Sequence, residues 1–121
     1  MAQHTNEARE RRIIDEIVVD AYDAQERALG WYYYLEEQLR FPFHARCTRS
    51  HPLSPLRRDE EVEVVKMPPE EVCEHEMFVT IEWENRTFAV PLSQLEPLEV
   101  DAETQQGLED WRYWKQQNYQ F

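Results

Sequence analysis

Glycine and cysteine are scarce in this chain of 121 residues, which contains two of each. Phosphate-binding loops need several glycines to bring backbone amides close to the phosphate, so the scarcity argues against a nucleotide loop. Cys47 and Cys73 are too few for a disulfide framework and predict buried free thiols in a reducing compartment. No apolar run approaches the roughly 18–20 residues that cross a bilayer, and residues 1–12 lack the apolar segment of a signal peptide. These absences predict a soluble, cytoplasmic protein.

Basic residues are scarce in the second half of the chain. Residues 1–58 carry nine acidic and nine basic side chains, whereas residues 59–121 carry sixteen acidic and four basic ones. The formal net charge of −12 therefore belongs to the second half, where the crowding destabilises a compact state unless a cation or a basic partner relieves it. The same charge argues against nucleic acid and against an anionic membrane as partners, because both would repel the chain.

The hydrophobic pattern begins with a helical period. Apolar residues recur at steps of three and four from Glu7 until Pro42 stops the helix, after residues 1–6 that we expect to be frayed. Tyr22-Asp23 is the expected bend, with Asp23 capping the second piece. Inside that piece Gly30 costs about 1 kcal/mol relative to alanine, which predicts close packing beside Trp31.

The period then changes to two and predicts a sheet. Strands are expected near residues 43–47, 62–65, 77–83, 86–92 and 98–100, with Glu84-Asn85 as a hairpin turn. Asp101 is the expected N-cap of a closing helix that ends near Asn118. The predicted architecture is one α+β domain spanning residues 1–121. In it a small curled antiparallel sheet (an SH3-like barrel) is flanked by a long N-terminal helix and a C-terminal helix.

Four consecutive aromatic residues, Trp31 to Tyr34, lie in the first helical region. On a helix they point in all directions, so at least one lies outside the core. We expect the sheet and the last helix to wrap this block, with Trp111, Tyr113 and Trp114 as packing partners. The alternative is a partner-binding surface with an aromatic anchor.

The acidic segment 59–76 is the main functional candidate. Hard cations such as Ca²⁺ take six to eight oxygen ligands, mostly carboxylate and carbonyl, at about 2.3–2.6 Å. Taken from the residues alone, the alternative is a solvated acidic face that keeps the protein in solution. An EF-hand loop starting at Asp101 would place Gln106 where glycine is required and Arg112 where glutamate is required, so any calcium site is of another type.

An up-and-down meander predicts two acidic ends. One end would gather Asp59, Glu60, Glu61, Glu84, Asp101 and Glu103. The other would hold loop 67–76 with the turn near Glu96, and would bring the end of the long helix, with Glu36 and Glu37, toward that loop. The candidate calcium ligands are therefore Glu70, Glu71, Glu74, Glu76, Glu37, Asp59, Glu60, Glu61, Asp101 and Glu103.

Other site chemistry has weaker signals. Cys73 and His75 could supply sulfur and nitrogen ligands, but neither this pair nor the set His44, Cys47 and His51 has paired zinc-finger spacing. No serine or cysteine nucleophile sits in a recognisable turn. We therefore expect neither a zinc site nor an enzyme.

Several long strings of this sequence occur in a known family. They are GWYYYLEE at 30–37, FPF at 41–43, ARC at 45–47, EHEMFV at 74–79, IEW at 81–83, AVPLSQL at 89–95 and EDWRYW at 109–114. On these strings the chain resembles the cyanobacterial calcium-binding protein family (CcbP-type) over nearly everything from Ile13 onward. The resemblance implies an acidic, soluble protein that binds Ca²⁺ through surface carboxylates without an EF-hand. In heterocyst-forming relatives it is tied to calcium control of cell differentiation.

The residues and the resemblance together predict reversible Ca²⁺ binding, as a buffer or a sensor, through carboxylate clusters on loops. The ion would neutralise mutually repelling carboxylates and stabilise the fold. The alternative is an acidic protein-interaction module that binds a basic partner protein and has no ion role. The expected partners are the calcium ion and a regulatory protein, with neither nucleic acid nor membrane.

Overall fold

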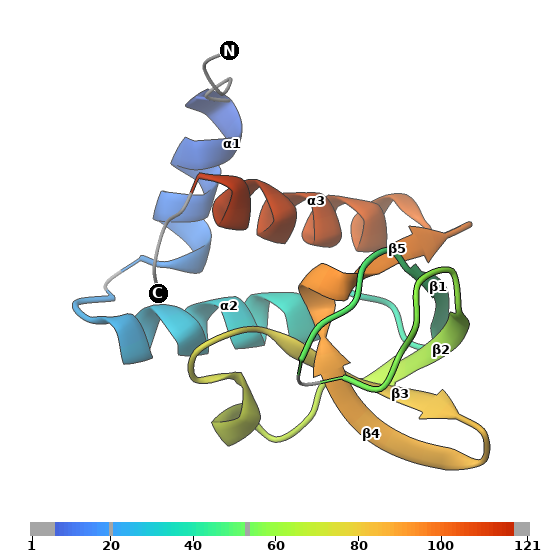
Figure 1. Ribbon diagram of the computed structural model, residues 1–121. Coiled ribbons are helices and arrows are strands. Elements are labelled where there is room, and N and C mark those ends of the chain that lie inside the picture. Colours follow the sequence, from blue (N-terminus) through green and yellow to red (C-terminus); the bar gives the residue numbers. More distant parts are fainter. Residues whose placement is uncertain (1–6, 20, 53, 118–121) are drawn as a thin grey trace.

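The computed structural model describes residues 7–19, 21–52 and 54–117 (Figure 1). The expectations for residues 1–6 and for a helix end near Asn118 lie outside these residues. Within them, no helix has both the length and the apolar character that crossing a membrane requires. The α+β class is confirmed by helices, short 3-10 and π turns, and strands. These are α1 (Glu7–Arg12), η1 (Ile13–Ile17), α2 (Ala24–Gln38), β1 (Phe43–Cys47), β2 (Glu61–Lys66), η2 (Glu70–Cys73), β3 (Phe78–Trp83), β4 (Arg86–Pro91), η3 (Leu92–Gln94), β5 (Leu95–Leu98) and α3 (Ala102–Gln116).

The strands form one antiparallel sheet in the order β4-β3-β2-β1-β5. β1 to β4 are the expected meander, whereas β5 returns to the free edge of β1, with Ala45 opposite Pro97. Because β4 and β5 both run opposite to β1, η3 carries the chain across the sheet end without reversing its direction. Between the described strands no β4–β5 pairing closes the sheet, so the expected SH3-like barrel is not confirmed.

The predicted caps and hairpin turn are present. Asp23 accepts a hydrogen bond from the Glu26 amide at 2.8 Å, and Asp101 accepts one from the Thr104 amide at 2.7 Å. The bond at Asp101 lowers the pKa of that carboxyl group. Glu84 and Asn85 both have positive φ, at 50° and 64°, as the tight turn between β3 and β4 requires. The last strand lies at β5, a few residues earlier than expected.

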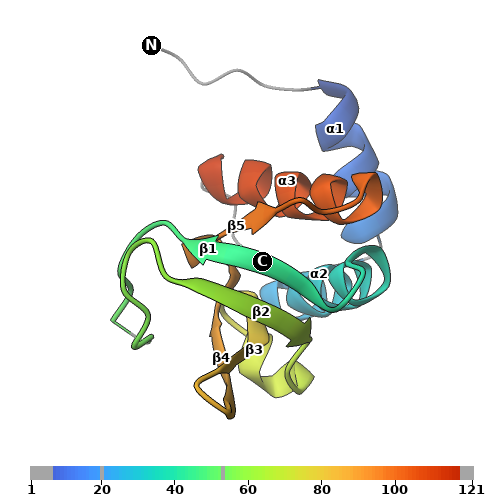
Figure 2. The same ribbon diagram turned by 90° about the vertical axis from the view of Figure 1, so that its right-hand side faces the viewer.

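The aromatic block of α2 packs mainly into the core. Trp31 is fully buried, and its ring lies 5.1 Å from that of Trp111 and 5.7 Å from that of Trp114, centroid to centroid. These contacts join α2 to α3, which lie side by side in both views (Figures 1 and 2). Tyr33 is 49% exposed and is the one member of the block outside the core. The core interpretation is therefore confirmed for Trp31, and Tyr33 points to the surface.

The long N-terminal helix is divided into two pieces by the break after η1. The carbonyl oxygen of Ile17 lies only 2.2 Å from where a Cβ of Gly30 would be. Gly30 therefore provides the close approach that its position predicts, and the neighbour is the backbone of η1. Helix α1 is held by a fully buried carboxylate of α3, Asp110.

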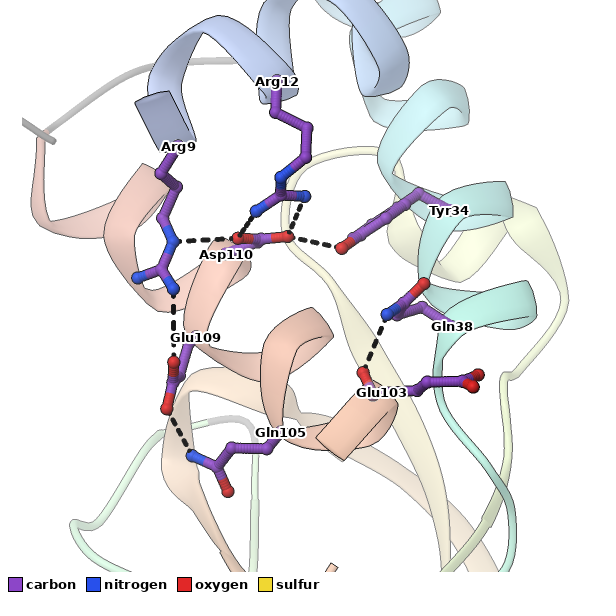
Figure 3. A network of polar contacts seen from close by, with 8 residues as sticks. All are labelled: Arg9, Arg12, Tyr34, Gln38, Glu103, Gln105, Glu109 and Asp110. Atoms are coloured by element: carbon purple, nitrogen blue, oxygen red, sulfur yellow. Dashed lines mark hydrogen bonds and ion pairs between the residues drawn. The ribbon is translucent and has the colours of Figure 1, made fainter. Parts of the chain in front are cut away.

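Asp110 joins three helices (Figure 3). Its carboxylate accepts two hydrogen bonds from Arg12, at 2.8 and 2.6 Å, and lies 3.1 Å from Nε of Arg9. The Tyr34 hydroxyl of α2 also donates to Asp110. Burial and this bond raise the pKa of Tyr34 to about 12. The one fully buried carboxylate of the described residues thus has its charge matched by two arginines.

Candidate metal centre

The first acidic group surrounds an arginine of β1, the strand beside the edge strand β5. Arg46 of β1 lies opposite Glu61 of β2 and opposite Glu96 of β5. Its guanidinium makes an ion pair with Glu96 at 3.1 Å. Glu96, then Asp59 and Glu61, raise the pKa of Arg46. This group of three carboxylates already contains a cation.

The second acidic group lies at the start of α3 and also contains an arginine. Arg40, between α2 and β1, pairs with Asp101 at 3.1 Å and with Glu103 at 2.8 Å. Glu103, and then Asp101, raise the pKa of Arg40. Asp101 therefore acts as a helix cap and an ion-pair partner at this position.

The third acidic group lies between α2 and η2, and we name Glu36, Glu70, Glu71 and Glu74 the α2–η2 acidic face. Tyr33 of α2 donates a hydrogen bond to Glu70 at 2.5 Å. That bond and the negative charge of Glu70, followed by Glu36 and Glu71, raise the pKa of Tyr33. Three carboxylates from two elements therefore act on one hydroxyl group.

The α2–η2 acidic face borders a cavity and is fixed to α2. The cavity has a volume of about 230 Å³ and lies between the first half of α2 and η2, with Glu70, Glu71 and Glu74 in its wall. The Tyr32 hydroxyl donates to the carbonyl of Pro68 at 2.5 Å and so anchors the segment before η2. Among the ion pairs of residues 7–19, 21–52 and 54–117, none involves a carboxylate of this face.

The remaining candidate ligands lie apart from one another. Glu76 accepts a hydrogen bond from the Ser93 hydroxyl at 2.9 Å and lies 3.6 Å from Nε2 of His51. Glu60 accepts from the Arg57 amide, which closes the turn before β2. Glu37 is exposed on α2 beside Glu36. None of these three arrangements adds an oxygen to the α2–η2 acidic face.

The predicted grouping of acidic ends is wrong for Asp101, Glu103 and Glu96. Asp59 is bonded to Cys47 at the end of β1, whereas Arg40, the partner of Asp101 and Glu103, precedes the start of β1. Glu96 lies with Arg46 and not with the loop after β2. The physical reason is η3, which lets β5 continue in the direction of β4 and so exchanges the two ends of the last strand. The expected placement of Glu84 near the start of β2 is confirmed by the β2–β3 register.

The carboxylates present suit a calcium ion by their chemistry but are not gathered around one point. In the described part of the chain, no three His, Cys, Asp or Glu side chains already converge as a metal site. The α2–η2 acidic face nevertheless supplies only oxygen donors, which suit Ca²⁺, and three of its four carboxylates, those of Glu70, Glu71 and Glu74, border a cavity. Cys73 is buried and accepts from the Phe78 amide, and burial raises the pKa of its thiol, so it does not present a thiolate for zinc. The donor set fits a hard cation once the carboxylates draw together.

Tyr33, Arg40 and Arg46 are the residues that sequence reasoning missed. The spacing of Tyr33 and Glu36 on one helix face is a signal that could have placed Tyr33 beside the acidic face. No local signal links Arg46 to Glu96, because fifty residues separate them.

Comparison with known proteins decides the family. The family model described as "Calcium binding", for CcbP-type proteins, matches residues 11–115. This chain belongs to the CcbP calcium-binding family. Its fold matches "The crystal structure of Anabaena CcbP" with a TM-score of 0.88 and 37% identity, over 99% of this chain and 98% of that one. A second structure, "Calcium binding protein in the calcium-binding form", matches with a TM-score of 0.87 and 37% identity over 100% of both chains. No curated protein matches by sequence.

Proposed function

We propose that this CcbP-family chain binds Ca²⁺ reversibly through the α2–η2 acidic face. One observation carries the proposal. The carboxylates near Arg46 and near Arg40 have an internal cation, whereas Glu36, Glu70, Glu71 and Glu74 have none among the described ion pairs. Carboxylates that repel one another without an internal cation gain most from an external one. Membership of a calcium-binding family, together with the similar structure in its calcium-binding form, supplies the identity of the ion.

The residues of the face would act as hard oxygen donors held on two elements. Glu36 comes from α2, and Glu70 and Glu71 come from η2, which Tyr32 and Tyr33 bond to α2. A bound ion would neutralise the negative charge of these carboxylates. Glu70 accepts the Tyr33 bond on Oε2, so an ion held by its Oε1 would lie beside the contact between Tyr33 and Glu70. Ion binding is thereby coupled to the contact between α2 and η2.

This coupling favours a sensor over a passive buffer. The ligands lie on segments more than thirty residues apart, so binding changes how tightly η2 is held to α2. Tyr33 and Val72, 49% and 41% exposed, lie on these two elements and would offer apolar contacts to a regulatory protein. Both cysteines are free and buried, which supports a reducing compartment such as the cytoplasm.

Calorimetric titration with calcium tests the proposed site. The variant Glu36→Gln/Glu70→Gln/Glu71→Gln removes three negative charges from the face, and we expect it to lose most of the calcium-binding heat. The matched control Asp59→Asn/Glu61→Gln/Glu96→Gln removes three charges around Arg46, and we expect it to bind like the unmodified chain. Loss of binding in the control alone would move the site to Arg46.

The alternative function is an acidic interaction module that binds a basic partner and has no ion role. The exposed Tyr33 beside the acidic face is the observation that favours it. Heat changes in titrations with Ca²⁺ and with Mg²⁺ separate the two. A saturable, Ca²⁺-selective isotherm supports ion binding, and indistinguishable responses to the two ions mean only general screening.

A further inference from the structure

A cavity larger than the one at the α2–η2 acidic face lies beside α3 and has no part in the proposed calcium site. It has a volume of about 490 Å³ and lies between α3, the η3–β5 segment and the residues that follow β1. In Figure 1 the η3–β5 segment, drawn in orange, lies below α3. Its volume falls in the range of about 300–1,000 Å³ that is typical of small-molecule sites.

The base of this cavity is apolar. Leu92 and Leu95 contribute from η3 and β5, and Leu108 and Trp111 contribute from α3. All four are at most 7% exposed. A ligand seated here would have to bring a hydrophobic group to match that base.

The rim of the cavity is basic, in a chain whose net charge is −12. Arg49, Arg112 and Lys115 line it, and all three are exposed. No ion pair with a described carboxylate involves any of these three residues. Lys115 lies over the Trp111 ring, with Nζ 5.8 Å from its centroid.

Acidic side chains are excluded from the lining. No Asp or Glu occurs among the described residues that line the cavity. The carboxylate bonded to a lining residue is Glu76, which accepts from the Ser93 hydroxyl. Three basic side chains that make no ion pair with a described carboxylate, above an apolar base in a chain of net charge −12, form an electrostatic trap for one negative charge.

We propose that this cavity binds a small amphiphilic organic anion, an aryl or short alkyl carboxylate. The hydrocarbon part would lie on Leu92, Leu95, Leu108 and Trp111. The carboxylate would face Arg49, Arg112 and Lys115. The site is separate from the α2–η2 acidic face, so its test does not depend on calcium.

The test is an NMR titration in EDTA with 3-phenylpropionate, followed at the Trp111 indole N–H and at the amides of Leu92, Leu95 and Leu108. We expect saturable shifts confined to the cavity. The neutral amide analogue and inorganic phosphate should each have a dissociation constant at least about tenfold higher. The amide lacks the negative charge, and phosphate lacks the hydrophobic group. Equal binding of either analogue, or no saturable shift up to about 10 mM probe, would overturn the proposal.

Two charge-matched variants complete the test. Arg49→Gln/Arg112→Gln/Lys115→Gln should raise the dissociation constant by about tenfold or more, since it removes the charge-assisted contacts. The control Arg11→Gln/Lys66→Gln/Arg86→Gln removes three exposed bases from outside the cavity and should leave affinity within about twofold. An equal loss in both variants would mean that only net charge matters and would contradict a built site.

Discussion

Two kinds of acidic surface occur in this molecule. Around Arg46 and Arg40, carboxylates from distant segments are drawn onto an arginine of the chain itself. Between α2 and η2, none of the described ion pairs involves a carboxylate of the acidic face, and Glu70 accepts a hydrogen bond from the Tyr33 hydroxyl. We propose that the absence of an internal counter-charge, and not acidic density alone, identifies the ion site of this molecule.

The largest effect is expected at Asp110, the buried carboxylate that pairs with arginines of the chain. Asp110→Ala removes the carboxylate that Arg9, Arg12 and Tyr34 share, and should lower the free energy of unfolding by about 3 kcal/mol. Denaturant unfolding measures it. Glu109→Gln is the control, because its pair with Arg9 is 43% exposed on the glutamate side and should contribute less than about 1 kcal/mol. Equal losses in the two variants would show that burial of Asp110 is not what matters.

Calcium should stabilise the chain by a somewhat smaller amount. At free calcium one hundred times the dissociation constant, one site adds about 2.7 kcal/mol to the free energy of unfolding. Thermal unfolding in EDTA, in millimolar Ca²⁺ and in millimolar Mg²⁺ at matched ionic strength measures the gain. We expect a rise with Ca²⁺ only, and none in the variant that lacks the charges of Glu36, Glu70 and Glu71. A rise of the same size in that variant would place the ion elsewhere.

Removing an internal cation should convert one kind of surface into the other. Arg46→Gln leaves Asp59, Glu61 and Glu96 without a counter-charge, and we expect one additional weak calcium site, with a dissociation constant of about 10⁻⁴–10⁻³ M. Equilibrium dialysis with radioactive calcium counts the sites. Arg58→Gln removes the same charge from an exposed loop position and should add none. If Arg46→Gln binds no additional calcium, the charge of Arg46 is not what prevents Asp59, Glu61 and Glu96 from binding an ion.

The smallest effect is expected at Tyr33. Its pKa lies above the ordinary value of 10.0 because Glu70, Glu36 and Glu71 favour the protonated hydroxyl. A cation bound to these carboxylates favours the tyrosinate, so the pKa should fall toward 10.0 when calcium is added. Ultraviolet titration of the chain and of Tyr33→Phe isolates this group. An unchanged pKa in saturating calcium would contradict a site beside Tyr33.

Tyr34 provides an internal control and a prediction for alkaline stability. Its pKa of about 12 comes from burial and from Asp110, so calcium should leave it unchanged. The folded chain holds this proton more tightly than the unfolded chain, whose tyrosines titrate near 10.0. The stabilisation is therefore complete below pH 10 and is lost as the pH rises through about 12. Tyr34→Phe should reduce that alkaline loss.

Much of the fold could be predicted from local signals. Asp23 and Asp101 mark helix starts, the 84–85 turn marks a hairpin, and alternation marks β1, β3 and β4. The direction of β5 was predicted wrongly, because Ser93-Gln94-Leu95 indicated a tight turn, whereas Leu92–Gln94 form η3 and the chain keeps its direction. That one direction decided whether Asp101 lay with Asp59 or away from it.

The candidate site was predicted in part. Loop 67–76 and the end of the long helix were placed together from the sequence, and in the structure Glu36, Glu70 and Glu71 all act on the Tyr33 hydroxyl. Glu76 was expected there and instead bonds to Ser93. The arginine partners could not be predicted, because Arg46–Glu96 and Arg40–Glu103 are long-range pairs that only the sheet order and the α2–α3 packing bring together.

The most direct measurement is a crystal structure of the chain grown with calcium, with the ion located by its anomalous scattering. We expect anomalous density bordered by carboxylate oxygens of Glu36, Glu70 or Glu71, and ion pairs at Arg46 and Arg40 as they are here. Density beside Asp59 and Glu61, or beside Asp101, with the α2–η2 carboxylates left in solvent, would contradict the account.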